Sequence, residues 1–566
     1  GKLLATEFSL NDTNQSIIVN KPTITTKVRS AIKKNSTTDT QLINPYTKSS
    51  WIDNVTANNL VKDHDYSAHL KMMIKNGDGS VSELKVNGKT VTADKDFTAD
   101  NSQMNFDVDF GNVDTTSLKG KALVVYADIT AKGDNDNALA THNDANDTNE
   151  TLQVTNPTMQ THALLDNDSI SNPSHTSRLL DRVTYSGVAE NQPVTLNAIL
   201  SDKDKKAIVA SSSNGDNANK EYDYLMGKVT FTPTSDNGTT DVPLQKVKAG
   251  SSDKDQDITE LAKDIDSASV RNSMNTLQAI NLDKGTPDTS SKDFQIDTTG
   301  LKGKSMVVFE DMSFGDDNTP VISHADVNDK DQTISVANMK IGTQALVNSK
   351  KVSNPSTTSK ISDKVKYEGA APGHPLDISA LATNQSDGTP VTIKKNGKTY
   401  NLMGKIRIIP GTASGTAIVP LQMVEVKDTN TNTTTQDSSK SDVTKDLTSE
   451  ASALERIKNN PIQVADPRTD SDANTDTDSD KYNIDTTSLR GKTITMFEDV
   501  TSPADNNSTA IVTEANLKNT DQSIRTTSPS IQTMQTANDQ KTIYSDAKDP
   551  KLVDKVQYKD FAPNEK

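Results

Sequence analysis

The sequence contains no cysteine, a single tryptophan and few other aromatic residues. Without cysteine the chain has neither disulfide bonds nor thiolate metal sites. No apolar run approaches the roughly 20 residues that a membrane-spanning helix needs. No signal peptide stands at the start, and the chain opens on Gly1 and Lys2 rather than Met. We therefore expect no membrane span, and we interpret the chain as a processed or truncated piece of a longer protein.

Apolar residues are also scarce, at 32%, and the mean hydropathy is -0.66. Asn, Asp, Thr and Ser dominate, which is typical of disordered chains and also of small β-domains with long polar loops. The net charge of -16 argues against nucleic acid as a partner. The 566 residues are enough for about three to five domains.

The strongest feature of the sequence is an internal repeat. A polar Gly-Lys turn followed by a β-branched and aromatic run occurs at residues 114–126, 297–309 and 485–497. A second block combines a Thr-bearing strand with a later Asp-x-Val pattern. A third block occurs at residues 224–233 and again at 401–410. The blocks alternate apolar and polar residues, as half-buried antiparallel strands do.

These patterns predict an all-β fold of tandem Ig-like antiparallel β-sandwich domains. Residues 257–266 and 441–457 break the β pattern and are typical of amphipathic helices. We therefore expect short helical insertions in the second and third copies. The predicted divisions are a last strand of a preceding repeat, three copies, and the first strands of a following repeat: 1–20, 21–155, 156–337, 338–527 and 528–566.

The end of the second copy carries a composite motif. A Val-Val-Phe-Glu run ending at Glu310 is followed by His324 and then by Asp329 and Gln332 in a terminal strand. In this order the residues resemble the VaFE-repeat or Thr-Gln ester-bond domain, which forms the stalks of surface adhesins in Gram-positive bacteria. The resemblance covers the second copy nearly end to end, and the other copies through their similarity to it.

The resemblance implies an internal ester, in which the Thr161 hydroxyl on the first strand attacks the Gln332 carboxamide on the last strand and ammonia leaves. The residues that would assist are Asp181, Glu310 and His324, with Asp329 as a further residue of the motif. A Thr hydroxyl needs a base to become a nucleophile, and an amide nitrogen leaves only with a proton. Two carboxyl groups packed together tend to keep one proton, which supplies that acid.

Each of these residues also has an ordinary interpretation. Thr is a common strand residue, Asp before Val-x-Tyr fits a turn, and a His in a Ser- and Asp-rich loop is usually solvated. The combination in family order favours the cross-link in the second copy.

The other copies keep only part of the motif. The third copy retains Thr343, Asp363, Glu498 and Gln522, with Glu514 at the His position and Asn519 at the Asp position. A Thr343–Gln522 bond there is left open, because Glu514 must replace an imidazole. The first copy retains Thr26, Asp53, His142 and Asp147, with Ala127 at the Glu position and Glu150 at the Gln position. A carboxylate is a poor acyl acceptor, so we predict no ester in the first copy.

The two ends carry fragments of the same pattern. The leading residues hold Gln15 with Glu7 at the His position, and the trailing residues hold Thr533 and Asp554. Their partners, if any, lie outside this chain or on a neighbouring molecule. Other motifs are weak. The acidic run at 470–480 lacks the Gly and the terminal Glu of an EF-hand loop, and we expect no metal or cofactor.

The favoured function is structural: a stalk segment of a secreted, cell-wall-associated adhesin or surface fibre. Its partners would be neighbouring repeats of the same protein, identical subunits in a fibre, and a host or cell-surface ligand that the sequence does not specify. One alternative is a filament subunit that exchanges strands with its neighbours. Another is a glycan- or host-protein-binding module. An enzyme acting on external substrates is least favoured, because the reactive cluster resembles one that acts once, on its own chain.

Overall fold

The computed structural model describes most of the chain. The residues that it leaves undescribed are 1–4, 7–9, 31–40, 135, 213–220, 249–264, 316–318, 427–459, 464–467, 470–479, 508–509 and 566. The predicted helix at 441–457 and most of the one at 257–266 therefore lie outside the described residues. In the described part of the second copy a helix, α1 (Ala268–Thr276), follows directly after.

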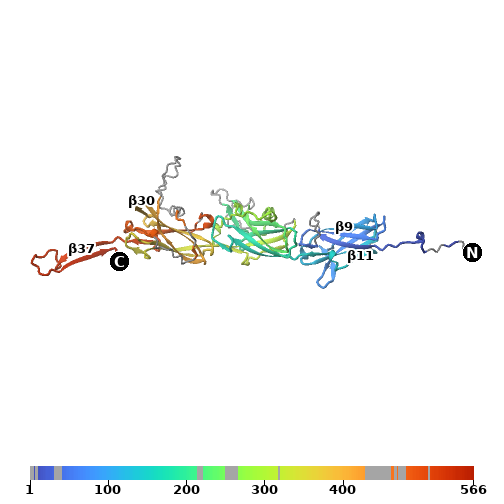
Figure 1. The fold of residues 1–566 in the computed structure, drawn as a ribbon, viewed down its shortest axis with the longest axis horizontal. Coiled ribbons are helices and arrows are strands. Elements are labelled where there is room, and N and C mark those ends of the chain that lie inside the picture. Colours follow the sequence, from blue (N-terminus) through green and yellow to red (C-terminus); the bar gives the residue numbers. More distant parts are fainter. Residues whose placement is uncertain are drawn as a thin grey trace, which may run out of the picture.

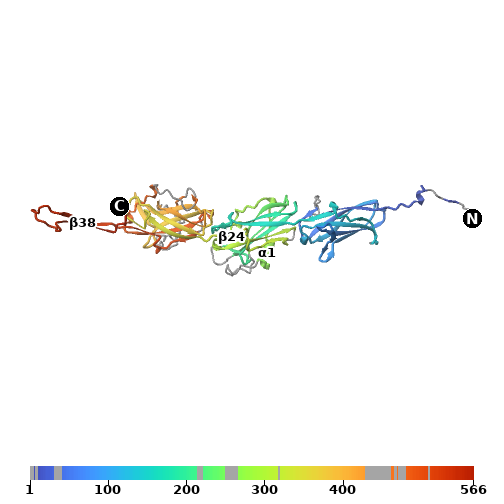
Figure 2. The same cartoon turned by 90° about the horizontal axis from the view of Figure 1, so that it is seen from below.

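The described chain forms three β-sandwich units in a row, with the two ends of the chain extending from opposite ends of the row (Figure 1). The view turned by 90° shows the same linear arrangement (Figure 2). A two-stranded hairpin, β37 (Ser530–Ala537) and β38 (Leu552–Lys559), projects beyond the third copy. The prediction of an all-β fold of tandem β-sandwiches is confirmed.

Each unit packs a three-stranded antiparallel sheet against a larger sheet. The small sheets consist of β1 (Thr23–Ser30), β3 (Ser49–Asn58) and β9 (Gln103–Val113) in the first copy, β13 (Thr158–Leu165), β15 (Leu179–Ser186) and β19 (Asn237–Pro243) in the second, and β25 (Lys340–Val347), β27 (Ile361–Glu368) and β31 (Ser414–Pro420) in the third. Every copy therefore begins with a strand at the edge of its small sheet, and the Thr that the sequence analysis singled out lies on this strand.

The larger sheets share one order of their main strands. In the first copy this order is β2 (Leu42–Ile43), β12 (Thr151–Val154), β10 (Ala122–Ala131), β4 (Asp65–Lys75) and β5 (Val81–Glu83), with β11 (Ala138–His142) on β10, β8 (Thr92–Thr98) on β4, and a separate hairpin of β6 (Lys85–Val86) and β7 (Lys89–Thr90). In the second it is β14 (Ile170–Ser171), β24 (Thr333–Val336), β22 (Ser305–Phe314), β16 (Val194–Ser201), β18 (Glu221–Phe231) and β17 (Val209–Ser212), with β20 (Gln245–Lys248) and β21 (Ile280–Asn281) on β18 and β23 (Ile322–His324) on β22. In the third it is β26 (Val352–Ser353), β36 (Ser523–Thr526), β34 (Thr493–Thr501), β28 (Leu376–Asn384), β30 (Lys398–Ile409) and β29 (Thr392–Lys395), with β32 (Gln422–Glu425) and β33 (Arg468–Thr469) on β30 and β35 (Ala510–Glu514) on β34.

The alternation of apolar and polar residues explains which face of each strand is buried. On β15 every second side chain is buried, including Val183 and Tyr185, and each copy has its own hydrophobic core between its two sheets. Complete burial of one such apolar side chain stabilises the folded state by about 1.5–3 kcal/mol. Gly238 leaves room for the Tyr185 ring, because a Cβ at this position would lie 2.5 Å from the Tyr185 hydroxyl oxygen.

The repeated Asp-Thr-Thr segment forms the same turn in each copy. In the second copy the Asp297 carboxylate accepts the Thr299 N–H at 2.9 Å, and Gly303 follows with a φ of 74°. Only glycine adopts such a conformation without strain. The segment ends in a short 3-10 helix, of which the chain has several: η1 (Thr13–Gln15), η2 (Thr116–Leu118), η3 (Thr148–Glu150), η5 (Leu282–Lys284), η6 (Lys292–Phe294), η7 (Thr299–Leu301), η8 (Asp480–Tyr482), η9 (Thr487–Leu489) and η10 (Pro503–Asp505).

Successive units are joined through a repeated junction. In each junction an Asn side-chain oxygen of one unit accepts the backbone N–H of an Ala in the next: Asn44 from Ala189 at 2.8 Å, Asn172 from Ala371 at 3.2 Å, and Asn354 from Ala562 at 2.9 Å. A Lys ammonium also crosses the first two junctions, from Lys119 to the Val321 carbonyl and from Lys302 to the Ile511 carbonyl, each at 2.6 Å. These direct contacts fix how one unit sits on the next. Within the described residues no helix is long and apolar enough to cross a membrane.

Candidate functional site

The small sheet of the second copy supplies a Thr and an Asp to the interior. Thr161 lies on the first strand, β13, and Asp181 lies on the neighbouring strand β15, directly opposite Ala163. Residues two apart on a strand point to the same face, so Thr161 and Asp181 share the inner face. Their exposed fractions are 7% and 0%. The pairing of the two strands therefore brings the predicted nucleophile and a carboxyl group to one buried place.

The large sheet supplies the remaining residues from three adjacent segments. Glu310 on β22 lies opposite His324 on β23, and Gln332 directly precedes β24. A tight turn positions Gln332, because one oxygen of Asp329 accepts the Asp331 N–H at 2.8 Å while the other binds His324 Nε2 at 2.8 Å.

A backbone bond ties this turn to the small sheet. The N–H of Ala163 on β13 donates to the Asp331 carbonyl at 2.9 Å. The first strand of the copy and the residue before Gln332 are therefore held together across the two sheets. No residue pattern in the sequence indicates this link, because backbone bonds leave no signature in residue types.

Polar atoms at this site are buried and largely unpaired. Glu310 is 3% exposed and Gln332 is 0% exposed, and Gln332 Nε2 donates to Glu310 Oε2. The Thr161 hydroxyl, both oxygens of Asp181 and the Gln332 carbonyl oxygen have no hydrogen-bond partner of normal geometry. Each such group costs about 1–3 kcal/mol when it stays buried and unpaired. A reaction that converts the hydroxyl and the amide into an ester removes part of this cost.

Burial also controls the protonation of the two carboxyl groups. Burial, and then the negative charge of Asp181, raise the pKa of Glu310 well above its usual range. Burial raises the pKa of Asp181 as well. Because two adjacent carboxylates repel each other, this arrangement favours retention of one proton by the pair. Glu310 accepts a hydrogen bond from the amide nitrogen of Gln332, which is the leaving group of the predicted reaction.

A family model described as the T-Q ester bond containing domain matches residues 22–154, 157–261, 259–336, 339–526 and 529–566. The chain belongs to this family. Each of the three sandwich units is thus a T-Q domain, and the trailing hairpin matches part of a further one. The resemblance drawn from the Glu310 motif is confirmed at the level of the family. The roles assigned to single residues remain predictions that the geometry now makes specific.

Comparison with solved structures finds a bacterial adhesin from Mobiluncus mulieris that contains intramolecular disulfide, isopeptide and ester bond cross-links, in two crystal forms. Each match has 12% sequence identity and a TM-score of 0.20, and covers 40% of this chain and 79% of the adhesin chain. No curated protein matches the sequence.

The third T-Q domain repeats the site with two substitutions. Thr343 is 7% exposed, Asp363, Glu498 and Gln522 are fully buried, and Gln522 Nε2 donates to Glu498 Oε2 at 2.5 Å. Burial, and then the charge of Asp363, raise the pKa of Glu498 well above its usual range. Glu514 lies opposite Glu498, where His324 lies opposite Glu310 in the second domain. A third acidic group thus replaces the imidazole.

Lys351 is a residue near this site that the sequence analysis missed. Its ammonium donates to the Asp521 carbonyl at 2.6 Å and to the Ala345 carbonyl at 3.1 Å. Burial raises the pKa of Asp363 to about 6, and the positive charge of Lys351 opposes that rise. The third domain therefore has a cation near its acidic pair although it lacks the histidine. No pattern in the sequence marks Lys351, because it acts from a loop position outside the motif.

The first T-Q domain keeps the geometry but not the reacting groups. Thr26 and Asp53 are buried on β1 and β3, and Ala127 lies opposite His142 on the neighbouring strand. Glu150 occupies the place of Gln332 and is fully buried. The predicted acyl acceptor and the predicted acid are both missing.

The ends of the chain carry the fragments that the sequence indicated. Asp12 accepts the Asn14 N–H at 2.9 Å, which is the same local turn that Asp329 makes before Gln332, and Gln15 ends it. Residues 16–22 form no strand, and Glu7 lies outside the described residues. Thr533 on β37 and Asp554 on β38 lie on an exposed hairpin. Among the described residues the structure thus brings neither end into a complete site.

Proposed function

We propose that the chain is a load-bearing stalk segment of a bacterial surface adhesin, and that its second T-Q domain closes an ester between Thr161 and Gln332. The observation that carries the proposal is the buried cluster of Thr161, Asp181, Glu310 and Gln332, with the Gln332 amide nitrogen bonded to Glu310. Membership of the T-Q family supports the same chemistry. A surface location follows from this role and is part of the proposal.

The reaction balances without a cofactor. The Thr161 oxygen attacks the side-chain carbonyl carbon of Gln332, and its proton passes to the Asp181–Glu310 pair. The C–N bond of the amide then breaks, the pair returns a proton to the nitrogen, and ammonia leaves. Each domain reacts once, so the chain consumes no external substrate. The imidazole of His324, held by Asp329 at 2.8 Å, lies opposite Glu310 at the edge of this site.

The position of the bond suits a protein under tension. Thr161 is three residues after the start of β13 at Thr158, and Gln332 directly precedes the last strand, β24. A pulling force enters the domain near Thr161 and leaves it near Gln332. An ester between the two residues transmits that force directly, so the roughly 170 residues between them bear no load. The linear arrangement of the three units is consistent with this role (Figure 1).

Single-molecule force spectroscopy on the full chain, tethered at its two ends, tests this proposal. The expected result is that the first domain unfolds and that the residues between 161 and 332 never extend. In T161A a further unfolding step appears, with a length gain of about 60 nm, because each extended residue spans about 3.5 Å. A wild-type chain that also shows this extra step would contradict the proposal.

A further inference from the structure

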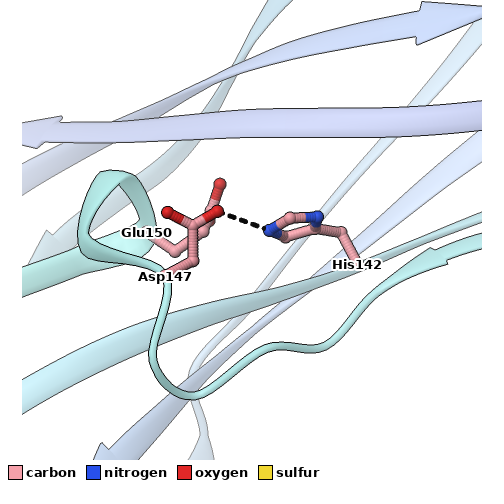
Figure 3. Close-up of side chains that lie close together, drawn as sticks. All are labelled: His142, Asp147 and Glu150. Atoms are coloured by element: carbon pink, nitrogen blue, oxygen red, sulfur yellow. Dashed lines mark hydrogen bonds and ion pairs between the residues drawn. The ribbon is translucent and has the colours of Figure 1, made fainter.

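The first T-Q domain holds an unpaired buried carboxyl group where the others hold a glutamine. Glu150 is fully buried at the end of η3, and neither of its oxygens has a hydrogen-bond partner. The carboxyl group faces His142 and Asp147, whose side chains are 20% and 22% exposed (Figure 3). An ionised carboxylate is unfavourable when it is buried without a donor or a cation, so a cation bound beside Glu150 would stabilise it.

The charged groups that act on Glu150 do not supply that cation. Asp53 is fully buried and accepts the Lys27 N–H at 3.0 Å, and its carboxyl group acts on Glu150 as a second negative charge beside that of Asp147. Three acidic groups and one imidazole therefore lie together, and a bound cation is the partner that would relieve their repulsion.

We propose that His142, Asp147 and Glu150 of the first T-Q domain bind a divalent transition-metal ion, with Zn²⁺ as the representative case. One ligand atom from each residue lies within 4.8 Å of the other two, and His142 Nε2 lies 2.9 Å from Asp147 Oδ2. Donor atoms about 2.0–2.2 Å from a tetrahedral Zn²⁺ lie roughly 3.3 Å from one another. A small outward movement of the His142–Asp147 pair thus makes room for the ion.

The surroundings prepare the ligands for this role. Asp147 Oδ1 accepts the Asn149 N–H at 2.8 Å, which fixes the carboxylate with its second oxygen towards His142. Outer hydrogen bonds of this kind orient metal ligands. The partial exposure of His142 and Asp147 gives the ion an entry path, while Glu150 closes the site from inside. One imidazole with two carboxylates favours a transition metal over Ca²⁺ or Mg²⁺, which prefer oxygen ligands throughout.

The other T-Q domains lack the same set of ligands. The second domain keeps the His324–Asp329 pair at 2.8 Å but has the neutral amide of Gln332 in the position of Glu150. The third domain has Glu514, Asn519 and Gln522 in these positions. Across the part of the chain that the structure describes, the His142, Asp147 and Glu150 group is the one in which three such donors meet. The change from Gln332 in the second domain to Glu150 in the first thus replaces an acyl acceptor with an anionic ligand.

Titration calorimetry of the full, chelator-treated chain with ZnCl₂ at pH 7.5 tests the proposal. The expected result is one ion per chain and, in buffers of different ionisation enthalpy, a net release of about one proton per ion, because metal ligands bind deprotonated. E150Q and H142A each weaken binding by at least about tenfold. The matched control is H69A/D94N, which removes a second His–Asp pair of the same domain, 2.7 Å apart but exposed, and leaves binding unchanged.

Three results would overturn the proposal. The first is no stoichiometric binding to the wild-type chain, in which case Glu150 shares a proton with its acidic neighbours. The second is binding that E150Q and H142A leave unchanged. The third is loss of binding in H69A/D94N, which would show an adventitious surface site. The wild-type stoichiometry and proton release decide the matter even if a variant fails to fold.

Discussion

The first and second T-Q domains place the same positions in the same geometry and differ in what those positions can do. In both, a His on a short strand binds an Asp at 2.8–2.9 Å, a Thr and an Asp are buried on the first two small-sheet strands, and the last turn aims a side chain inward. The second domain has Glu310 and Gln332 where the first has Ala127 and Glu150. Two substitutions separate a site in which Glu310 lies beside an amide from a site in which Ala127 and a carboxyl group take these places.

This comparison shows that the fold does not depend on the reacting groups. The strand pairings that place Asp53 near Thr26 in the first domain are those that place Asp181 near Thr161 in the second. They are specified by alternating burial and by the Asx turn before the last strand. The sandwich can therefore lose its cross-link without losing its architecture. In a tandem array the consequence is uneven reinforcement, with the first domain expected to yield before the second.

Removing the proposed nucleophile is expected to have the largest effect. T161A leaves Gln332 unreacted, so the second domain no longer loses one ammonia relative to the mass calculated from the sequence, and it opens a loop of about 170 residues. By analogy with disulfide loops, the free energy of unfolding of the second domain falls by about 5 kcal/mol. Mass spectrometry of the intact chain measures the mass, and denaturant unfolding measures the free energy of unfolding.

The control is T158A, an exposed threonine of the same strand that hydrogen-bonds Ser186 at 2.8 Å. It should leave the cross-link intact and the stability within about 0.5 kcal/mol of the wild type. Equal losses in T158A and T161A would show that the effect is not a cross-link.

Restoring the missing groups should convert the first domain into the second. A127E/E150Q supplies an acid beside His142 and an amide opposite Thr26, so the intact chain should lose one ammonia more than the wild-type chain loses. Neither single variant should form the bond, because each lacks one of the two groups. If the double variant loses no more ammonia than the wild type while the first domain stays folded, the two substitutions do not account for the difference between the domains.

The stability of the first domain should also depend on pH. The folded pKa of Glu150, about 9, lies above its unfolded value of about 4.5, so the folded domain holds the proton more tightly. Its stability is greatest below pH 4.5 and falls as the pH rises towards 9. With about 1.4 kcal/mol per pH unit, the loss at pH 7 is about 3 kcal/mol. Hydrogen exchange of the β10 amides in metal-free buffer, followed from pH 4.5 to pH 9, measures this loss of stability.

E150Q should flatten this profile, because a neutral amide does not titrate. A wild-type first domain whose stability is constant between pH 5 and pH 9 would contradict the assignment of a buried, protonated Glu150.

The third T-Q domain should lie between the other two. We expect its Thr343–Gln522 bond to form slowly and incompletely, since an acidic side chain, Glu514, stands where the second domain has the imidazole of His324. E514H/N519D restores the His–Asp pair and should raise the cross-linked fraction, read as the mass of the isolated peptides after digestion. A cross-linked fraction that is the same with and without the His–Asp pair would show that the imidazole is dispensable. Lys351 would then be the cation that acts on the acidic pair of this domain.

Much of this architecture was predictable from the sequence, for physical reasons. The 114–126 segment and its two repeats carry a turn that hydrogen bonds fix locally, and alternating burial then specifies the strands. Thr161, Asp181, Glu310 and Gln332 were predicted because their order matches the family. The structure adds their burial and their contacts, which depend on strand register.

Other features leave no local signal. The Ala163–Asp331 backbone bond, the Asn-to-Ala junctions and the approach of Lys351 to Asp363 arise from segments far apart in the sequence. No sequence signal marks the group of residues around Glu150, for a related reason. A glutamate in the place of Gln332 indicates the loss of an acyl acceptor. Its significance as an anion depends on how completely the fold buries it.

The central claim is that the second domain is cross-linked and the first is not. Digestion of the denatured wild-type chain, followed by mass spectrometry of the peptides, tests it most directly. We predict that the peptide containing Thr161 remains covalently joined to the peptide containing Gln332, with one ammonia lost, and that the Thr26 and Glu150 peptides separate at full mass. Free Thr161 and Gln332 peptides, or a joined Thr26–Glu150 pair, would contradict the account.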